Sequence, residues 1–152
     1  MLTYVLLVGY GTAEMPPKAG YFTERGVDPS SGGKKHCDFY ISQRQVRHYM
    51  RYGPAHKFFD SLTIPYILLH PSVIFLGLKR ENMEKGLCYA GIPPVRYVNA
   101  EVTAPPHPGM IFMVFVDDKS HVFNWRWERV DKSNNSYPID SKDRFTKTIW
   151  SI

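Results

Sequence analysis

Cysteine is scarce in this chain of 152 residues, in which only Cys37 and Cys88 occur. They lie far apart, form no CxxC pair and have no histidine at ligand spacing, so neither a zinc ribbon nor a disulfide framework is indicated. A long apolar run is also lacking, because Leu2 to Val8 is short, has no basic region before it and is followed by Gly9 and Gly11. A signal peptide or a membrane helix fits poorly. We expect a reduced, cytoplasmic protein with no membrane partner.

Signature motifs of common enzyme classes are missing as well. The GYG near the amino terminus matches neither GxGxxG nor GxxxxGK[ST], so a nucleotide-cofactor fold is unsupported. Neither HExxH nor GxSxG occurs. Cys88 lies in the apolar segment GLCYAG, which is typical of an inert structural thiol rather than a catalytic one. The sequence therefore predicts no cofactor and no metal ion.

Positive charge is in excess, since 19 Lys and Arg residues against 14 Asp and Glu residues give a net charge of +5. This balance favours a polyanionic partner such as RNA, DNA or an acidic protein, although a mildly basic protein without such a partner stays open. Hydrophobic residues make up 43% of the chain and supply one sizeable core, so we expect a single domain over 1–152. The sequence carries no signal of oligomeric state.

The first half of the chain contains the helical patterns. Leu2 to Tyr10 is expected to form a buried strand, and the Gly-, Pro- and Ser-rich stretch 11–35 a long loop or flap. Between Ser42 and Leu62 the spacing predicts two short helices, with Ser42 as the N-cap of the first and Pro54 in the opening turn of the second. Basic residues on the first helix form either a solvated face or a phosphate track: Arg44, Arg47, His48 and Arg51.

After Pro65 the pattern is that of β-strands. Six apolar segments bounded by turn residues follow one another, namely YILLHP, VIFLGL, LCYAGIPP, RYVNAEVT, MIFMVFVDD and HVFNWRWERVD. The short connection 117–120 predicts an antiparallel hairpin between the last two. Residues 132–152 are expected to form a loop and a short closing element. The predicted fold class is α+β, with two short helices in the first half packed on an antiparallel meander of about four to five strands.

Strict alternation along His121 to Asp131 would sort the side chains onto two faces. His121, Phe123, Trp125, Trp127 and Arg129 would share the core face. Val122, Asn124, Arg126, Glu128 and Val130 would share the other, which would project an amide, a guanidinium and a carboxylate into solvent or a cleft.

This polar row suits the cleavage of a phosphodiester. Glu128 could act as a base on a ribose hydroxyl, and Arg126 could hold the developing negative charge, with Asn124 as a substrate contact. The alternative is a plain ion pair on an exposed sheet. Histidine is a suitable acid because its ordinary pKa is about 6.5. His121 at a strand end and His107 in the loop APPHPG are the better placed candidates.

Further contacts to a nucleic acid would come from residues outside this strand. Arg80 follows IFLGLK, while Arg96 and Tyr97 begin a strand after two prolines. If the meander folds back, these residues would approach the polar row and give a basic cleft with an aromatic ring for base stacking. They would serve equally well as charges that protect a sheet edge.

The arrangement resembles the barnase, EndoU, colicin and RelE-like (BECR) group of small nucleases and toxins. The resemblance covers roughly Ser42 to Asp131 and is carried by the helix around HKFFDSL, the strand ending HPSVIFLGL and the hairpin MIFMVFVDDKSHVFNWRWE. It implies RNA cleavage without metal by side chains on the sheet, with Glu128, Arg126 and a histidine matched by chemical type.

The first functional hypothesis is thus a metal-independent ribonuclease, either a toxin or an RNA-processing factor, with RNA as substrate and a protein partner or inhibitor beside it. A second is a non-catalytic module that binds a protein or a nucleic acid. A third is a small-molecule enzyme with a pocket under the APPHPG loop.

Overall fold

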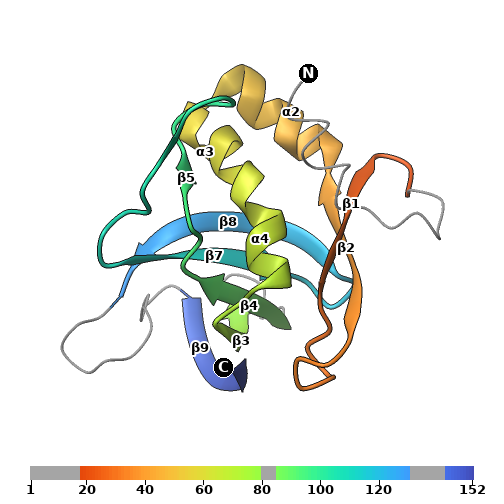
Figure 1. Ribbon diagram of the computed structural model, residues 1–152. Coiled ribbons are helices and arrows are strands. Elements are labelled where there is room, and N and C mark those ends of the chain that lie inside the picture. Colours follow the sequence, from red (N-terminus) through yellow and green to blue (C-terminus); the bar gives the residue numbers. More distant parts are fainter. Residues whose placement is uncertain (1–17, 80–84, 131–142) are drawn as a thin grey trace.

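The structure is a computed structural model, and it describes residues 18–79, 85–130 and 143–152. A curled seven-stranded sheet makes up most of it, and short helices cover one face (Figure 1). The sheet strands are β1 Tyr21–Val27, β2 His36–Ser42, β3 Val73–Lys79, β4 Lys85–Gly91, β7 Met110–Val116, β8 His121–Arg129 and β9 Asp143–Ser151; a separate pair consists of β5 Arg96–Tyr97 and β6 Thr103–Ala104. The helices are α2 Gln43–Tyr52, α3 Ala55–Asp60, the 3₁₀ turn η1 Ser61–Thr63 and α4 Ile64–Leu69. None of these helices is long and apolar enough to cross a membrane.

The strand order is β1-β2-β8-β7-β4-β3-β9, so the sheet is larger than the predicted meander and is mixed rather than antiparallel. The expectation of four to five antiparallel strands was wrong. The amino-terminal hairpin β1–β2 joins the sheet beside β8, far from it in sequence, and β2 runs parallel to β8 over only two residue pairs, Tyr40 with His121 and Ile41 with Val122. The order of the segments in the sequence does not predict such a long-range pairing.

The predicted loop 11–35 was also wrong over its described part. Tyr21–Val27 forms β1, which pairs antiparallel with β2 over its whole length. Only the polar stretch 28–35 is a connection, closed by the backbone hydrogen bond from Asp28 N to Lys35 O at 2.9 Å. Charged residues within β1 hid its alternation, because Glu24 faces inward at a position where an apolar residue would be expected.

Ile64–Leu69 forms helix α4, where the segment YILLHP had been predicted to be a strand. Pro65 lies in the first turn, where the missing N–H costs no hydrogen bond. Four of the six residues are buried, so the helix is apolar around most of its surface and shows no periodicity that could separate it from a buried strand. Gly26 of β1 allows the helix to approach closely, since an added Cβ would lie 2.9 Å from Leu68 Cβ.

The local predictions between Ser42 and Leu62 are confirmed. Helix α2 begins after Ser42, whose side chain accepts a hydrogen bond from Gln45 N at 3.2 Å, and it ends at Gly53, after which α3 begins. The hairpin between β7 and β8 is antiparallel, as predicted. The strand predicted at 2–10, Arg80 and residues 132–142 of the predicted loop lie outside the described residues.

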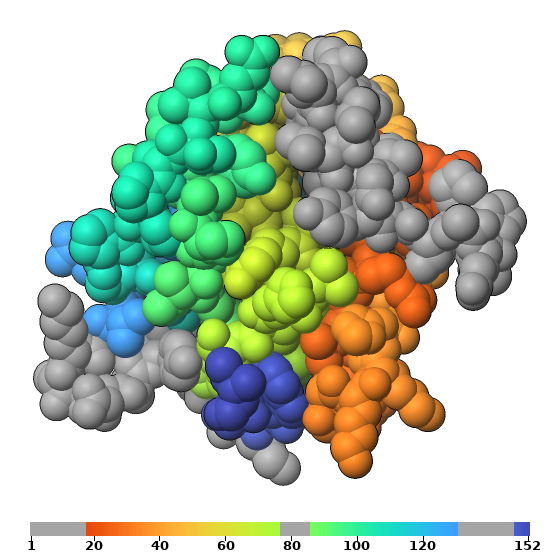
Figure 2. All heavy atoms as spheres, in the orientation of Figure 1, coloured from red at the N-terminus to blue at the C-terminus, as the bar shows by residue number. Residues whose placement is uncertain are grey.

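The sheet curls so strongly that its first hairpin meets its last strand. Gly33, in the connection between β1 and β2, lies against Trp150 of β9, and a Cβ added there would be 2.8 Å from the indole Nε1. Figure 2 shows these two parts, orange and dark blue, side by side. The strand β9 is the short closing element expected from the sequence, and Trp150 packs against the main core.

Two buried clusters lie on opposite faces of the sheet. The larger one lies under the helices and includes Phe39, Ile67, Tyr89 and Trp125; we call this the helix-bearing face. The other cluster lies on the opposite face and consists of Val73, Phe75, Cys88, Ala90, Ile111, Met113 and Phe115. Strands β3, β4 and β7 contribute to both clusters and are therefore apolar on both sides, which explains the uninterrupted apolar run of β7.

Candidate functional site

A β-bulge in β8 decides which side chains share a face. Val116 of β7 pairs with Val122, but its neighbour Phe115 pairs with Asn124, so Phe123 is an extra residue in β8. Val122, Trp125 and Trp127 consequently belong to the helix-bearing face, whereas Phe123 packs on the opposite face. The predicted strict alternation is wrong before the bulge, because an inserted residue shifts it by one position.

The bulge brings His121 to the same face as Arg126. The His121 ring contacts those of Tyr21 and Tyr40, with centroids 5.0 and 5.6 Å away. Both tyrosines alternate with residues of the helix-bearing core, so they point to the opposite face. The Arg126 guanidinium lies over the ring of Phe115, 4.6 Å from its centroid, on that face too.

The residues around His121 form a compact polar and aromatic group, which we call the His121 cluster: Lys18, Tyr21, Tyr40, Asp117 and His121. Lys18 Nζ lies 2.8 Å from His121 Nε2 and 4.9 and 4.7 Å from the ring centroids of Tyr21 and Tyr40. An ammonium only donates, so Nε2 accepts, and a neutral His121 carries its proton on Nδ1. That nitrogen lies 3.6 Å from Asp117 Oδ2. The side chain of His121 is 24% exposed, which leaves it accessible.

Turn geometry holds the cluster in place. Asp117 Oδ1 accepts hydrogen bonds from the backbone N–H groups of Lys119 and His121, at 2.9 and 2.8 Å. Ser120 adopts a positive φ of 66° and its carbonyl accepts from Tyr40 N at 2.9 Å, which joins the β7–β8 hairpin to β2. The carboxylate beside His121 is thereby fixed by the hairpin that the sequence predicted.

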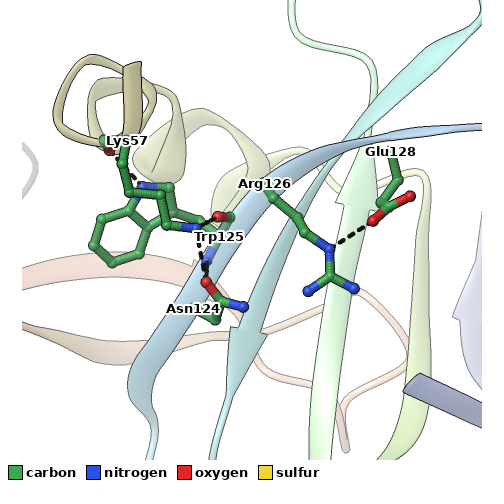
Figure 3. Close-up of polar contacts among 5 residues, drawn as sticks. All are labelled: Lys57, Asn124, Trp125, Arg126 and Glu128. Carbon is green, nitrogen blue, oxygen red and sulfur yellow. Dashed lines mark hydrogen bonds and ion pairs between the residues drawn. The ribbon is translucent and has the colours of Figure 1, made fainter. Parts of the chain in front are cut away.

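Arg126 and Glu128 form the ion pair that the sequence left open as an alternative. Arg126 Nε lies 2.7 Å from Glu128 Oε1, and both side chains are 26% exposed (Figure 3). At roughly 3.3 Å per residue, Glu128 lies about 20 Å from His121 along β8. The two groups share a face but are too far apart to exchange protons with one phosphodiester.

The edge of β8 beyond Val122 is closed by two helices. Because β2 ends at Ser42, no strand among residues 18–79, 85–130 and 143–152 pairs with the carbonyls of Phe123 and Trp125 on this edge of β8. Gln45 of α2 donates to Phe123 O at 3.2 Å, and Lys57 Nζ of α3 donates to Trp125 O and, at 2.7 Å, to Asn124 Oδ1 (Figure 3). In return the indole N–H of Trp125 donates to Lys57 O at 2.7 Å.

No sequence pattern pointed to Lys57, whose ammonium is largely removed from solvent in the fold. Burial lowers its pKa from 10.5 to about 8, and the nearby Arg126 acts in the same direction. Asp60, one helical turn further on, is 8% exposed, and burial raises the pKa of its carboxyl. His56 and His107 lie near enough to Asp60 to oppose that rise.

The other predicted site residues lie elsewhere. His107 contacts the ring of Trp127 edge-on, with centroids 5.1 Å apart, and Trp127 belongs to the helix-bearing face. Arg96 donates to Pro105 O at 3.1 Å, and it lies with Tyr97 in β5, which contacts α3 and η1. These three residues are not brought to the face of Arg126. Asn124 is engaged by Lys57.

Cys88 is the remaining reactive side chain that the sequence analysis considered. The Cys88 thiol is 1% exposed and its pKa is raised by burial, which agrees with the structural role expected of it. Among the described residues, no three His, Cys, Asp or Glu side chains lie close enough together to hold a metal ion.

The sequence analysis did not select Lys18, Tyr21 and Tyr40. Their segments were either assigned to the predicted loop or not assigned to any helix or strand. The alternation of β1 and β2 was the signal that could have found the two tyrosines.

The His121 cluster thus combines an imidazole, a carboxylate, an ammonium and two phenols on one partly exposed face. Comparisons of the chain with protein-family models, with curated proteins and with solved structures found no match.

Proposed function

We propose that the protein is a metal-independent endoribonuclease whose catalytic centre is the His121 cluster. The observation that carries the proposal is the 2.8 Å contact between Lys18 Nζ and His121 Nε2, flanked by two tyrosine rings. Imidazole, ammonium and phenol are the groups that a strand cleavage without metal requires: a base, a cation for the phosphorane and a proton donor.

In the proposed reaction a phosphate of RNA takes Lys18 as its counter-ion, which frees Nε2 of His121. Nε2 then removes the proton of the adjacent 2′-hydroxyl, and the 2′-oxygen attacks phosphorus. The bond to the 5′-oxygen breaks, and that oxygen takes a proton from the hydroxyl of Tyr21 or Tyr40. The products are a 2′,3′-cyclic phosphate and a 5′-hydroxyl, with no water consumed in this step.

The surroundings of the cluster support each role. Asp117, held by two backbone N–H groups, faces the Nδ1 side of His121 and stabilises the imidazolium that forms. Lys18 is exposed and can follow the phosphate as its charge grows. The tyrosine rings offer surfaces on which bases stack. Arg126, about 15 Å along β8 on the same face, would contact the RNA backbone further along the strand.

The test is cleavage of a single-stranded RNA in excess chelator. We expect His121→Ala to lower the rate by about 100-fold or more, because it removes the general base. Lys18→Ala should lower it as well, by removing the cation beside the phosphorane. His48→Ala is the matched control, since His48 is an exposed histidine on α2, and it should cleave like the parent protein. Equal cleavage by the His121 and His48 variants would reject the proposed centre.

RNA binding without turnover is the second candidate function, and the cations and rings that share one face favour it. In that case the protein in excess chelator would leave RNA intact, yet it would bind RNA with an affinity that falls steeply as the salt concentration rises. Arg126→Ala should then lower the slope of log affinity against log salt concentration by about 1, the value for one phosphate contact. Binding that is insensitive to salt would contradict this candidate.

A further inference from the structure

Helix α2 presents a row of arginines to solvent. Arg44, Arg47 and Arg51 are all exposed and follow one another at intervals of three and four residues. With 3.6 residues per turn, the three side chains fall within about 60° of one another around the helix, and their positions extend over roughly 10 Å along its axis. We call these three residues the arginine row. Val46, on the buried side of the helix, is 4% exposed and packs in the core.

No carboxylate among the described residues neutralises the arginine row. None of the ten residues of α2 is acidic. The arginines that form ion pairs within residues 18–79, 85–130 and 143–152 are Arg25 and Arg126, which lie on strands. Arg47 donates a hydrogen bond to the side-chain oxygen of Gln43 at 3.1 Å, but an amide is neutral and leaves the charge of the guanidinium in place.

The arrangement of these charges destabilises the helix itself. Arg44 with Arg47 and Arg47 with Arg51 are like-charge neighbours at i, i+3 and i, i+4, and such pairs are unfavourable. Arg44 also lies in the first turn, near the positive end of the helix dipole, where an acidic residue would be favoured and none is present. Since no carboxylate in the described part of the fold offsets these costs, the arginine row suits an anion supplied from outside the chain.

The amino-terminal end of α2 adjoins the His121 cluster. Ser42, the N-cap, comes two residues after Tyr40. The N–H of Gln43 donates to the carbonyl oxygen of Gly20 at 3.0 Å, directly before Tyr21 in the chain. The arginine row therefore begins within a few residues of the cluster and leads away from it along the helix. A flexible single strand that leaves the cluster at this edge of the sheet can reach the helix.

We propose that the arginine row binds the phosphate backbone of single-stranded RNA and holds the strand on one side of the His121 cluster. The inference rests on the proposed function, because it takes the partner to be the RNA that the cluster cleaves. Guanidinium groups stay charged and form paired hydrogen bonds with phosphate oxygens. Contacts to the backbone read no base, so the arginine row adds affinity without sequence preference.

An anionic membrane is the other large polyanion that a basic helix meets, and the fold favours it less. A helix that binds a lipid surface inserts an exposed apolar face. In α2 the exposed Met50 and Tyr52 lie on opposite flanks of the arginine row, so they form no continuous apolar face. His48 packs against the ring of Tyr52, with centroids 5.3 Å apart, and is not part of the arginine row.

The test is the binding of a short fluorescein-labelled oligouridylate to the His121→Ala protein in excess chelator, measured by fluorescence anisotropy at several salt concentrations. The test variant adds Arg44→Gln, Arg47→Gln and Arg51→Gln to this background. We expect it to bind about tenfold more weakly or worse. The slope of log affinity against log salt concentration should fall by about 2, since each phosphate contact of a single strand contributes about 0.7.

Two controls separate the arginine row from net charge and from folding. Lys34→Gln, Lys35→Gln and Arg129→Gln, combined in the same background, remove the same charge from exposed positions elsewhere and should keep the slope. The melting temperature of the arginine variant should be no lower than that of the background protein, because glutamine is a good helix former and the like-charge pairs are gone.

The outcomes distinguish this inference from the proposed function. An equal loss of affinity in the two triple variants, a lower melting temperature of the arginine variant, or arginine-dependent binding to phosphatidylserine vesicles but not to RNA each overturns the inference. Cleavage that depends on His121 would still support the proposed function in those cases. RNA affinity that depends on the arginine row supports the inference even if the parent protein leaves RNA intact in chelator, in which case only the cleavage proposal fails.

Discussion

Glu24 lies on β1 with 0% of its surface exposed, and within the described part of the chain neither carboxyl oxygen has a hydrogen-bond partner. Burial raises the pKa of this carboxyl from 4.5 to about 9, because the charged form loses its hydration without a compensating contact. The native protein therefore keeps Glu24 protonated at neutral pH, whereas the unfolded chain releases that proton above pH 4.5.

The sign of the effect on stability follows from these two proton affinities. Between pH 4.5 and about 9 the folded state binds one proton more than the unfolded state at this site, so the free energy of unfolding falls as pH rises. Each pH unit in that window costs about 1.4 kcal/mol, which amounts to about 3 kcal/mol at pH 7.

Glu24→Gln removes the ionisation and keeps the size of the side chain. We expect the variant to gain stability over the parent protein as pH rises, by about 3 kcal/mol between pH 5 and pH 7. Urea unfolding at several pH values measures the difference, and taking the difference cancels the contributions of other groups. Glu101→Gln, at an exposed glutamate, should run parallel to the parent protein. The reasoning would be refuted if the stability of Glu24→Gln ran parallel to that of the parent protein across the pH range. It would also be refuted if the variant were less stable than the parent protein at pH 8.

Two further predictions concern the packing and charge of the helices. Gly26→Ala should destabilise the protein by about 1–3 kcal/mol in thermal unfolding, because the new methyl group would meet the Phe39 ring at 2.6 Å and Leu68 Cβ at 2.9 Å; an unchanged melting temperature would contradict the close packing of α4. The Cε resonance of Lys57 in ¹³C-lysine NMR should titrate near pH 8; a Lys57 resonance that titrates at the ordinary lysine pKa of 10.5 would show that the ammonium is not desolvated.

Local signals predicted the parts of the fold that depend on neighbours in sequence. The N-cap at Ser42, the helix break at Gly53 and the short turn after Asp117 each act over a few residues, and the elements around them were predicted correctly. The residue types of the candidate site were also partly predicted, since His121 was selected from its strand-end position.

Parts that depend on distant contacts could not be predicted. Helix α4 is buried on most sides, so its sequence Ile64–Leu69 lacks the period that separates a helix from a strand. The pairing of β2 with β8 joins segments some eighty positions apart, and only tertiary packing selects it. The bulge at Phe123 leaves the alternating pattern of residue types intact while shifting the faces by one residue.

That bulge connects the helices to the proposed catalytic face. Where β2 departs, Gln45 and Lys57 satisfy the carbonyls on either side of Asn124, so the irregular strand has hydrogen-bond partners on its open edge. An unpaired buried carbonyl would cost about 1–3 kcal/mol, so these two donors stabilise the open edge of β8. A regular strand would turn His121 toward the helix-bearing core, away from Lys18 and the two tyrosines. The bulge therefore selects the face on which His121 lies, and Gln45 and Lys57 close the strand edge beside it.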